Sequence, residues 1–235
     1  MNSCKKLRGL LEGPELLMAP GVADALNARL VAEANFKAIY MTGSGTTASK
    51  LGMPDIGLLS VSEMVDNASR IADASGLPLI SDADTGYGGP LNVHRTIRMF
   101  EKAGAAGVHI EDQNWPKRCG HLSGKTIIPA REMISKIQAA CDGRVDDNFV
   151  IIARTDALAL EGLNSALDRA EQYAEAGADI IFVESPSTLE EIKAIPKKIR
   201  KPTLYNMAAS GKTPFLKNTE IEKFGFKVVI YPNFA

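Results

Sequence analysis

Residues 77–84 read LPLISDAD, an apolar run that ends in two aspartates. A short, nearly continuous apolar run is typical of a strand in a parallel sheet that is buried on both faces. Seven further runs of this kind recur along the chain. They are LLMAPG (16–21), KAIYMTG (37–43), AGVHIED (106–112), NFVIIARTD (148–156), DIIFVES (179–185), PTLYNM (202–207) and KVVIYP (227–232). This recurrence indicates eight buried strands.

Amphipathic helical patterns lie between several of these runs, at residues 92–104, 164–179 and 188–200. Strands that alternate with helices predict an α/β fold, and eight of them predict a (β/α)8 TIM barrel. An open doubly wound sheet is the alternative, although it normally uses fewer strands. Because the sequence stops just after the eighth run, we expect a single barrel domain over residues 1–235 that lacks the eighth helix and any C-terminal helix.

The composition excludes several classes of function. The 235 residues carry a net charge of −1, so no general attraction to nucleic acid or anionic membranes is expected. No apolar run approaches the roughly 20 residues that span a bilayer, and the first 20 residues lack the pattern of a signal peptide. The three cysteines have no metal-binding spacing, which favours a cytoplasmic protein without disulfides.

Acidic side chains gather where the predicted strands end. Asp82 and Asp84 close the third run, and Glu111 closes the fourth, two residues after His109. Active sites of barrel enzymes lie at these carboxyl ends. Residues two apart on a strand point the same way, so both aspartates are expected to enter the barrel mouth. Carboxylate oxygens suit Mg²⁺ or Mn²⁺; the alternative is that these carboxylates only cap helices or turns.

Two further features belong to the same predicted mouth. Arg154 and Glu184 end the next two strands, where a guanidinium could bind a substrate carboxylate and the acid could pair with it. A purely structural ion pair is the alternative. The glycine-containing stretch TGSGTTAS (42–49) could bind an anion through its backbone N–H groups. Its spacing does not fit a dinucleotide-binding fingerprint or a P-loop.

Residues 116–125, PKRCGHLSGK, place Cys119 among Lys117, Arg118 and His121. Nearby positive charges lower the pKa of a thiol, and the two glycines at 120 and 124, on either side of His121, suit a loop that closes over a substrate. We therefore interpret Cys119 as a reactive thiol, with a solvated basic loop as the alternative.

We assign no catalytic or metal-binding role to Cys4, Cys141 or His94. His94 and Cys141 fall in predicted helices, and Cys4 falls in an N-terminal segment that we expect to be unanchored. One cysteine and one histidine cannot form a zinc site, and no second pair completes one.

Several motifs together resemble the isocitrate lyase and phosphoenolpyruvate mutase superfamily. They are KRCGH (117–121), HIED (109–112), DADTGYGG (82–89), TGSGTTASKLGMPD (42–55) and ARTDA (153–157), in an order that matches from about Ala19 to Pro232. The chain is most similar to the group of methylisocitrate lyases, 2,3-dimethylmalate lyases and oxaloacetate acetylhydrolases. The resemblance implies Mg²⁺-dependent cleavage of a carbon–carbon bond in a 2-hydroxy carboxylate, giving pyruvate and a second acid through an enolate-type intermediate.

The resemblance also implies roles for individual residues. Asp84 would bind the metal directly, Asp82 and Glu111 would bind its waters, and Asp55 would lie near it. Residues implied to contact substrate are Tyr40, Thr42, Gly43, Ser44, Gly120, Arg154, Glu184 and Asn206. Cys119 would be the general acid, tuned by Arg118 and His121. The superfamily forms tetramers that exchange the eighth helix, so a homo-oligomer is expected for the full-length form.

Departures from the methylisocitrate lyase pattern narrow the substrate. Leu122 and Ser123 replace an Arg-Pro pair, and Met207–Ala209 replace a segment with a Thr-Glu pair. Losing polar groups that would pair with a third carboxylate favours a dicarboxylate, such as an alkylated malate or oxaloacetate, because a buried unpaired charge is costly. A carboxyphosphonoenolpyruvate phosphonomutase, an oxaloacetate hydrolase or decarboxylase, and an inactive carboxylate-binding barrel remain alternatives.

Overall fold

The computed structural model describes residues 2–120, 124–208, 211 and 213–233. Its eight strands form a closed parallel barrel in sequence order, and β1 pairs with β8 to close it. The strands are β1 (Leu17–Val22), β2 (Ile39–Met41), β3 (Leu79–Asp82), β4 (Gly107–Glu111), β5 (Val150–Thr155), β6 (Ile180–Val183), β7 (Thr203–Asn206) and β8 (Val228–Tyr231). The predicted (β/α)8 barrel is confirmed.

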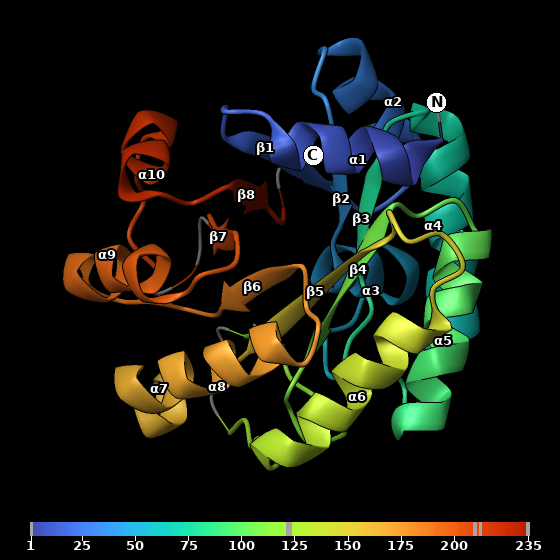
Figure 1. Ribbon diagram of the computed structural model, residues 1–235. Coiled ribbons are helices and arrows are strands. Elements are labelled where there is room, and N and C mark those ends of the chain that lie inside the picture. Colours follow the sequence, from blue (N-terminus) through green and yellow to red (C-terminus); the bar gives the residue numbers. More distant parts are fainter. Residues whose placement is uncertain (1, 121–123, 209–210, 212, 234–235) are drawn as a thin grey trace.

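Helices surround the barrel on its outer side (Figure 1). They are α2 (Ala25–Glu33), α3 (Gly43–Leu51), α4 (Val61–Ser75), α5 (Pro90–Lys102), α6 (Ala130–Gly143), α7 (Leu158–Glu161), α8 (Leu163–Glu175), α9 (Leu189–Lys198) and α10 (Asn218–Phe224). The three helical patterns predicted from sequence correspond to α5, α8 and α9. Within the described residues, which run to Asn233, no helix follows β8.

Local sequence signals explain where two of these helices begin. The Ser60 hydroxyl accepts a hydrogen bond from the backbone N–H of Glu63, and the Glu63 carboxylate accepts one from the backbone N–H of Ser60. Thr188 and Glu191 form the same reciprocal capping box at the start of α9. Each box satisfies backbone N–H groups that the helix itself cannot pair.

The core has two layers, and an N-terminal helix seals one end of the inner layer. The outer layer lies between the strands and the surrounding helices, while Tyr40, Ile152 and Phe182 belong to the cluster inside the barrel. Helix α1 (Ser3–Glu12) lies across the barrel in Figure 1, and Leu7 joins the inner cluster with no exposed surface.

The expectation of an unanchored N-terminal segment is therefore wrong. Cys4 is buried, and it lies three residues before Leu7 on one face of α1. Arg8 donates to the backbone carbonyl of Asn148 and pairs with Asp179 at 2.9 Å. The helical spacing of apolar residues and the arginine together hold the segment against the barrel floor.

Leu7→Ala is expected to lower the free energy of unfolding by about 2–5 kcal/mol, because it leaves a cavity in a fully buried cluster. Urea unfolding measures the change. Lys6→Ala, on the exposed side of the same helix, is the control and should change the stability by less than about 0.5 kcal/mol. Equal stability of the two variants would show that α1 does not contribute to the packed core.

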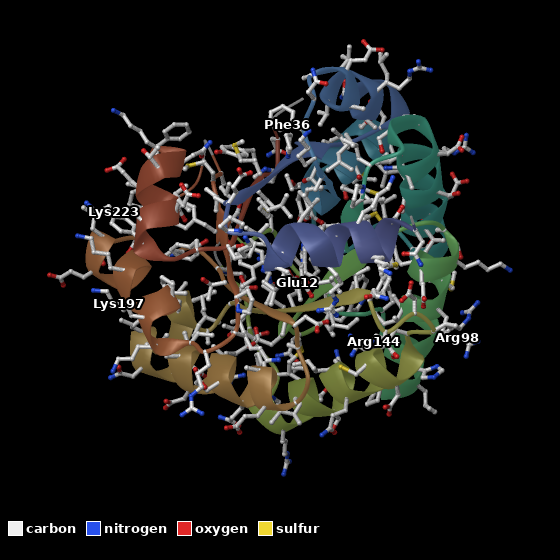
Figure 2. The ribbon with its side chains drawn as sticks, turned by 45° about the horizontal axis from the view of Figure 1, so that its top comes forward. Glu12, Phe36, Arg98, Arg144, Lys197 and Lys223 are labelled. Carbon is white, nitrogen blue, oxygen red and sulfur yellow. The ribbon has the colours of Figure 1, made fainter. Side chains whose placement is uncertain are left out.

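Charged side chains cover the outside of the helical ring. Arg98, Lys197 and Lys223 project away from the barrel on α5, α9 and α10 (Figure 2). In the part of the chain that the structure describes, no helix is both long and apolar enough to cross a membrane.

Candidate active site

A cavity of about 260 Å³ opens at the carboxyl ends of the strands. It is lined by twelve residues predicted as site residues from sequence: Tyr40, Thr42, Ser44, Asp55, Asp82, Glu111, Arg118, Cys119, Gly120, Arg154, Glu184 and Asn206. Lys117, Phe182, Ala208, Ile230, Pro232 and Asn233 complete the lining. Asp84 lies directly behind it against Lys117, and Gly43 lies against Asp82. His121 lies outside the described residues.

Lys117 is at the centre of the acidic side of this cavity. Its ammonium lies 2.6 Å from Asp55 Oδ2 and 2.7 Å from Asp84 Oδ1. Burial alone would lower the pKa of Lys117, but the carboxylates of Asp84 and its neighbours outweigh it and hold the pKa well above its usual value. The sequence analysis placed this lysine beside the Cys119 thiol. The ammonium also lies in the same cavity lining as Cys119, with both of its ion-pair partners on the carboxylate side.

Asp82 and Asp84 meet through a turn, not through strand alternation. Strand β3 ends at Asp82, and Asp84 follows in the left-handed backbone region with φ of 49°. Asp82 Oδ1 accepts a hydrogen bond from the Asp84 N–H at 2.9 Å. The predicted shared direction of the two side chains along a strand is therefore corrected, although both carboxylates are buried at the mouth.

Asp55, Asp82, Asp84 and Glu111 form a carboxylate cluster, and the negative charge of two of its members is poorly compensated. Burial raises the pKa of Asp84 to about 6 even with Lys117 beside it, and burial raises the pKa of Glu111 well above its usual value. Among the described residues Glu111 Oε1 is buried without a hydrogen-bond partner. These oxygens fit Mg²⁺, which prefers hard oxygen ligands and retains several waters.

The cluster does not form a closed cage. Nowhere in the described chain do three or more His, Cys, Asp or Glu side chains lie close enough to bind one metal ion directly. The arrangement fits one directly bound carboxylate with others acting through water, as the family resemblance implies for Asp84, Asp82 and Glu111.

Arg154 is the second buried cation of the cavity, and its Nε lies 3.3 Å from Glu111 Oε2. Its Nε and Nη2 donate to the Asp156 carboxylate at 2.9 and 3.1 Å. Its Nη1 lies 3.3 Å from Glu184 Oε2, and Asn206 Nδ2 donates to both Glu184 oxygens at 3.3 Å. The Arg154 guanidinium, the Glu184 carboxylate and the Asn206 amide can together bind a substrate carboxylate and the oxygen on the adjacent carbon. Asp156, which the sequence analysis did not assign, is the residue that orients Arg154.

The glycine-containing stretch after β2 opens helix α3 at the cavity wall. Thr42 is its N-cap and accepts a hydrogen bond from the Gly45 N–H at 3.2 Å. A Cβ at Gly43 would lie 2.4 Å from Asp82 Oδ2, so only glycine allows this helix end to approach the carboxylate. The N-terminus of a helix favours an anion, which suits a substrate carboxylate.

Tyr40 and His109 form a pair beneath the cavity. Tyr40 Oη and His109 Nε2 are 2.8 Å apart, and the two rings stack at 5.8 Å between centroids. Burial lowers the pKa of His109 and favours the neutral ring. Tyr40 lines the cavity, whereas His109 is fully buried and supports Tyr40 from below.

The loop that carries Cys119 is tied to the loop that carries Asp55. The Cys119 N–H donates to the Asp55 carbonyl at 3.1 Å. Trp115 covers Gly57, where a Cβ would lie 2.9 Å from the indole ring, and Trp115 also contacts Tyr87. Cys119 is half-buried at the cavity wall. The two loops therefore place a thiol beside the carboxylate cluster.

Gly120 brings the same loop into direct contact with the arginine side of the cavity. A Cβ at Gly120 would lie 2.4 Å from Arg154 Nη2 and 2.7 Å from Glu184 Cγ. Real side chains do not tolerate such distances, so this position requires glycine.

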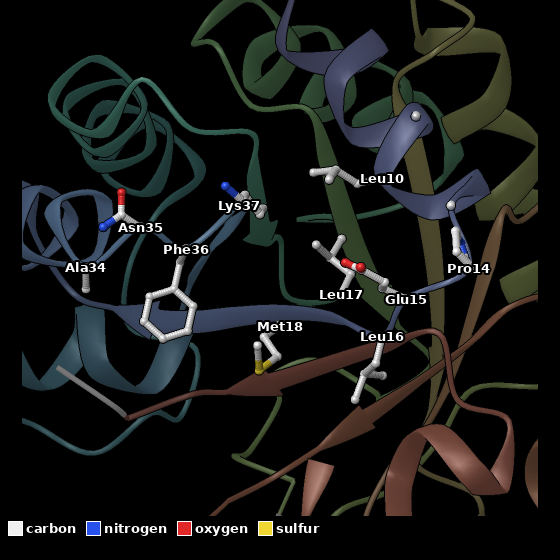
Figure 3. A pocket seen from close by; sticks show the side chains of 12 residues that line it. Leu10, Pro14, Glu15, Leu16, Leu17, Met18, Ala34, Asn35, Phe36 and Lys37 are labelled. Atoms are coloured by element: carbon white, nitrogen blue, oxygen red, sulfur yellow. The ribbon is translucent and has the colours of Figure 1, made fainter. Parts of the chain in front are cut away.

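A larger groove of about 410 Å³ lies at the opposite end of the barrel, between α1, the start of β1 and residues 34–37. Its lining includes Leu10, Leu16, Met18 and Phe36 (Figure 3). It contains none of the carboxylate cluster, Arg154 or Cys119. The smaller cavity at the carboxyl ends is therefore the candidate active site.

Comparison with known proteins agrees with this geometry. The family described as phosphoenolpyruvate phosphomutase matches residues 7–235. The chain belongs to this family. The resemblance to the isocitrate lyase and phosphoenolpyruvate mutase superfamily is thereby confirmed, and the match includes every strand of the barrel and both loops of the site.

The known proteins that this chain is similar to have several different activities by name. A 2,3-dimethylmalate lyase of Eubacterium barkeri is 50% identical over 232 residues, which are 99% of this chain and 80% of the relative. A solved oxaloacetate acetylhydrolase, in complex with 3,3-difluorooxalacetate, has a TM-score of 0.95 at 43% identity and covers 98% of this chain and 80% of its own.

A further solved relative contains a metal. A phosphonopyruvate hydrolase in complex with oxalate and Mg²⁺ has a TM-score of 0.89 at 33% identity, covering 99% of this chain and 81% of its own.

Proposed function

We propose that this protein is a Mg²⁺-dependent carbon–carbon lyase that cleaves a 2-hydroxy dicarboxylate of the alkylated malate class to pyruvate and a second carboxylic acid. The observation that carries the proposal is the half-buried Cys119 thiol in one cavity with a carboxylate cluster and the Arg154–Glu184–Asn206 group. The 50% identity to a 2,3-dimethylmalate lyase supports the same conclusion.

The two sides of the cavity would divide the work of binding. Arg154, held by Asp156 and Glu184, would bind a substrate carboxylate with the helix end at Thr42 and Gly43. Tyr40, Ser44, Gly120 and Asn206 would complete the contacts to that end of the substrate. Because these groups are fixed before substrate arrives, little reorganisation is needed during the reaction.

The carboxylate cluster is the proposed metal site. Asp84 would hold Mg²⁺ directly, Asp82 and Glu111 would act through its waters, and Asp55 would lie beside it; Mn²⁺ has the same ligand preference. When bound, the metal would draw electron density from the C2 oxygen and the adjacent carboxylate of the substrate.

The protein's own groups would move the protons. The C2 hydroxyl proton would pass to one of the carboxylates that line the cavity as the C2–C3 bond breaks and C2 becomes the carbonyl carbon of pyruvate. The bonding electrons would remain on the leaving fragment as an enolate-type carboxylate. Cys119 would then donate its thiol proton to C3, with Arg118 and His121 tuning the thiol.

The apolar part of the cavity lining supports a dicarboxylate over a tricarboxylate such as methylisocitrate. Ala208, Ile230 and Pro232 offer apolar contacts there. An alkyl substituent would gain burial against these three side chains, whereas a carboxylate placed against them would lose water without gaining a polar partner from their side chains.

Hydrolytic cleavage of oxaloacetate is the second candidate. The TM-score of 0.95 and 43% identity to an oxaloacetate acetylhydrolase favour it. A phosphonomutase reaction on carboxyphosphonoenolpyruvate and a binding-only barrel are further outcomes of the test below.

The test is proton NMR of the purified protein with Mg²⁺ and four substrates: 2,3-dimethylmalate, 2-methylisocitrate, oxaloacetate and carboxyphosphonoenolpyruvate. We expect pyruvate and a second acid from dimethylmalate. EDTA should lower the rate at least about 100-fold, because the cluster would lose the cation that polarises the substrate. Adding back Mg²⁺ or Mn²⁺ should restore turnover.

The other outcomes separate the alternatives. Formation of acetate and oxalate from oxaloacetate would show that the site catalyses hydrolytic cleavage and not the proposed lyase reaction. Full activity in EDTA would contradict the metal assignment. Binding of oxalate without turnover of any of the four compounds would favour a carboxylate-binding barrel.

We further propose that the protein forms a homotetramer and acts in the cytoplasm. Leu26 and Leu30 on α2 are 69% and 53% exposed, which suits burial against another subunit. No disulfide links the cysteines of the described structure, and a protein of a reducing compartment needs none. Sedimentation velocity would determine the oligomeric state.

A further inference from the structure

Lys125 is a buried cation that the proposed reaction does not use. Its ammonium donates to the Gly120 carbonyl at 2.5 Å and to Asp156 Oδ1 at 2.6 Å. Its side chain is 3% exposed. A buried ammonium is costly unless it is paired, so these two partners fix its position.

The first partner of Lys125 is the carboxylate that orients Arg154. Asp156 binds the guanidinium through two hydrogen bonds and Lys125 through a third. Asp156 is itself held from behind, because its N–H donates to Asp112 Oδ1 at 2.9 Å. Asp112 also accepts from Thr155 and Tyr173 at 2.8 Å each. This end of the network is anchored to β5 and α8.

The second partner of Lys125 is the loop residue next to the reactive thiol. Gly120 follows Cys119 directly and lies against Arg154 and Glu184 without room for a Cβ. The carbonyl of Gly120 is held by Lys125. One ammonium therefore joins the backbone beside the proposed acid to the carboxylate that orients the proposed substrate-binding arginine.

We propose that Lys125 is a positioning residue that holds the Cys119–Gly120 backbone in register with the Arg154 guanidinium. The distance between the thiol and the bound substrate depends on this link. A misplacement of about 1 Å in such an arrangement can reduce a rate about 100-fold. The consequence for turnover rests on the proposed function, but the consequence for the position of Cys119 does not.

The test compares Lys125→Met with wild type and with Lys102→Met, which removes an exposed lysine on α5. The first readout needs no substrate: the rate at which iodoacetamide alkylates Cys119, followed by mass spectrometry of its peptide. We expect Lys125→Met to raise this rate about tenfold, because the released backbone samples open conformations more often. Lys102→Met should match wild type.

The second readout is turnover of the substrate that the NMR panel identifies. Lys125→Met should reduce kcat/KM about 100-fold, with most of the loss in kcat, and Lys125→Arg, which keeps the charge and the donors, should recover part of it. If the protein proves to have another activity or none, the alkylation result still tests the positioning role.

A merely structural ion pair gives a different result. Lys125→Met would then unfold at a lower urea concentration than wild type, while iodoacetamide would alkylate Cys119 of the folded variant at the wild-type rate. That outcome would overturn the proposal. If Lys125→Met does not fold, Lys125→Gln, whose shorter uncharged side chain cannot hold both the Gly120 carbonyl and Asp156 as the ammonium does, serves in the same alkylation assay. A wild-type rate in that variant also overturns the proposal.

Discussion

Replacing Cys119 by serine is expected to reduce kcat by about 10²–10⁴-fold while leaving substrate affinity nearly unchanged. The serine hydroxyl keeps the size and hydrogen-bonding capacity of the thiol, but it is a much weaker acid and cannot deliver its proton to the leaving carbon. Arg154, Glu184 and Asn206 remain in place to bind the substrate. Steady-state kinetics and calorimetric titration of the substrate or of oxalate measure the two quantities.

Cys141→Ser is the matched control for this variant. Cys141 lies on α6, where its thiol donates to the Gly177 carbonyl outside the cavity, so its replacement should keep kcat near the wild-type value. Full turnover by Cys119→Ser would rule out the thiol as the general acid. Loss of binding instead of turnover would mean that Cys119 holds the substrate.

Lys117→Met is expected to destabilise the metal-free protein by about 3–5 kcal/mol, because it leaves the buried carboxylates of Asp55 and Asp84 without their cation. Mg²⁺ should stabilise the variant more than wild type, since the ion supplies positive charge that the lysine no longer provides. Urea unfolding with and without Mg²⁺ measures both effects. Activity should be lost in either condition, because Lys117 lines the cavity.

The double variant Lys117→Met with Asp84→Asn is the control for this experiment. Because Asp84→Asn removes a negative charge that Lys117→Met leaves without its cation, the double variant should recover part of the lost stability without Mg²⁺. An unfolding midpoint of Lys117→Met equal to that of wild type would show that the two carboxylates do not depend on the lysine.

The barrel was predictable from sequence because its strands are buried on both faces. Residues 149–153, for example, are continuously apolar, and the spacing between such runs leaves room for a helix. Helix α1 was not predicted. Its buried face presents Cys4 and Leu7, and nothing in that short pattern reveals that the open end of a barrel lies opposite.

The site was predictable where residue type and strand end coincide, as for Asp82, Glu111 and Arg154. The direction of a long charged side chain was not. Lys117 lies two residues from Cys119 in sequence, yet its partners Asp55 and Asp84 come from other loops. The role of Asp156 could not be predicted either, because it depends on where Arg154 and Lys125 place their side chains and not on the position of Asp156 at a strand end.

The packing of Trp115 over Gly57 has a practical consequence. This residue is the single tryptophan of the chain, so intrinsic fluorescence comes from one position at the edge of the proposed site. The indole touches the loop that carries Asp55 and stands four residues before Cys119 in the other loop. Any ligand that shifts one loop against the other changes the solvent around the indole, so the emission wavelength gives a label-free optical signal for binding in the unmodified protein.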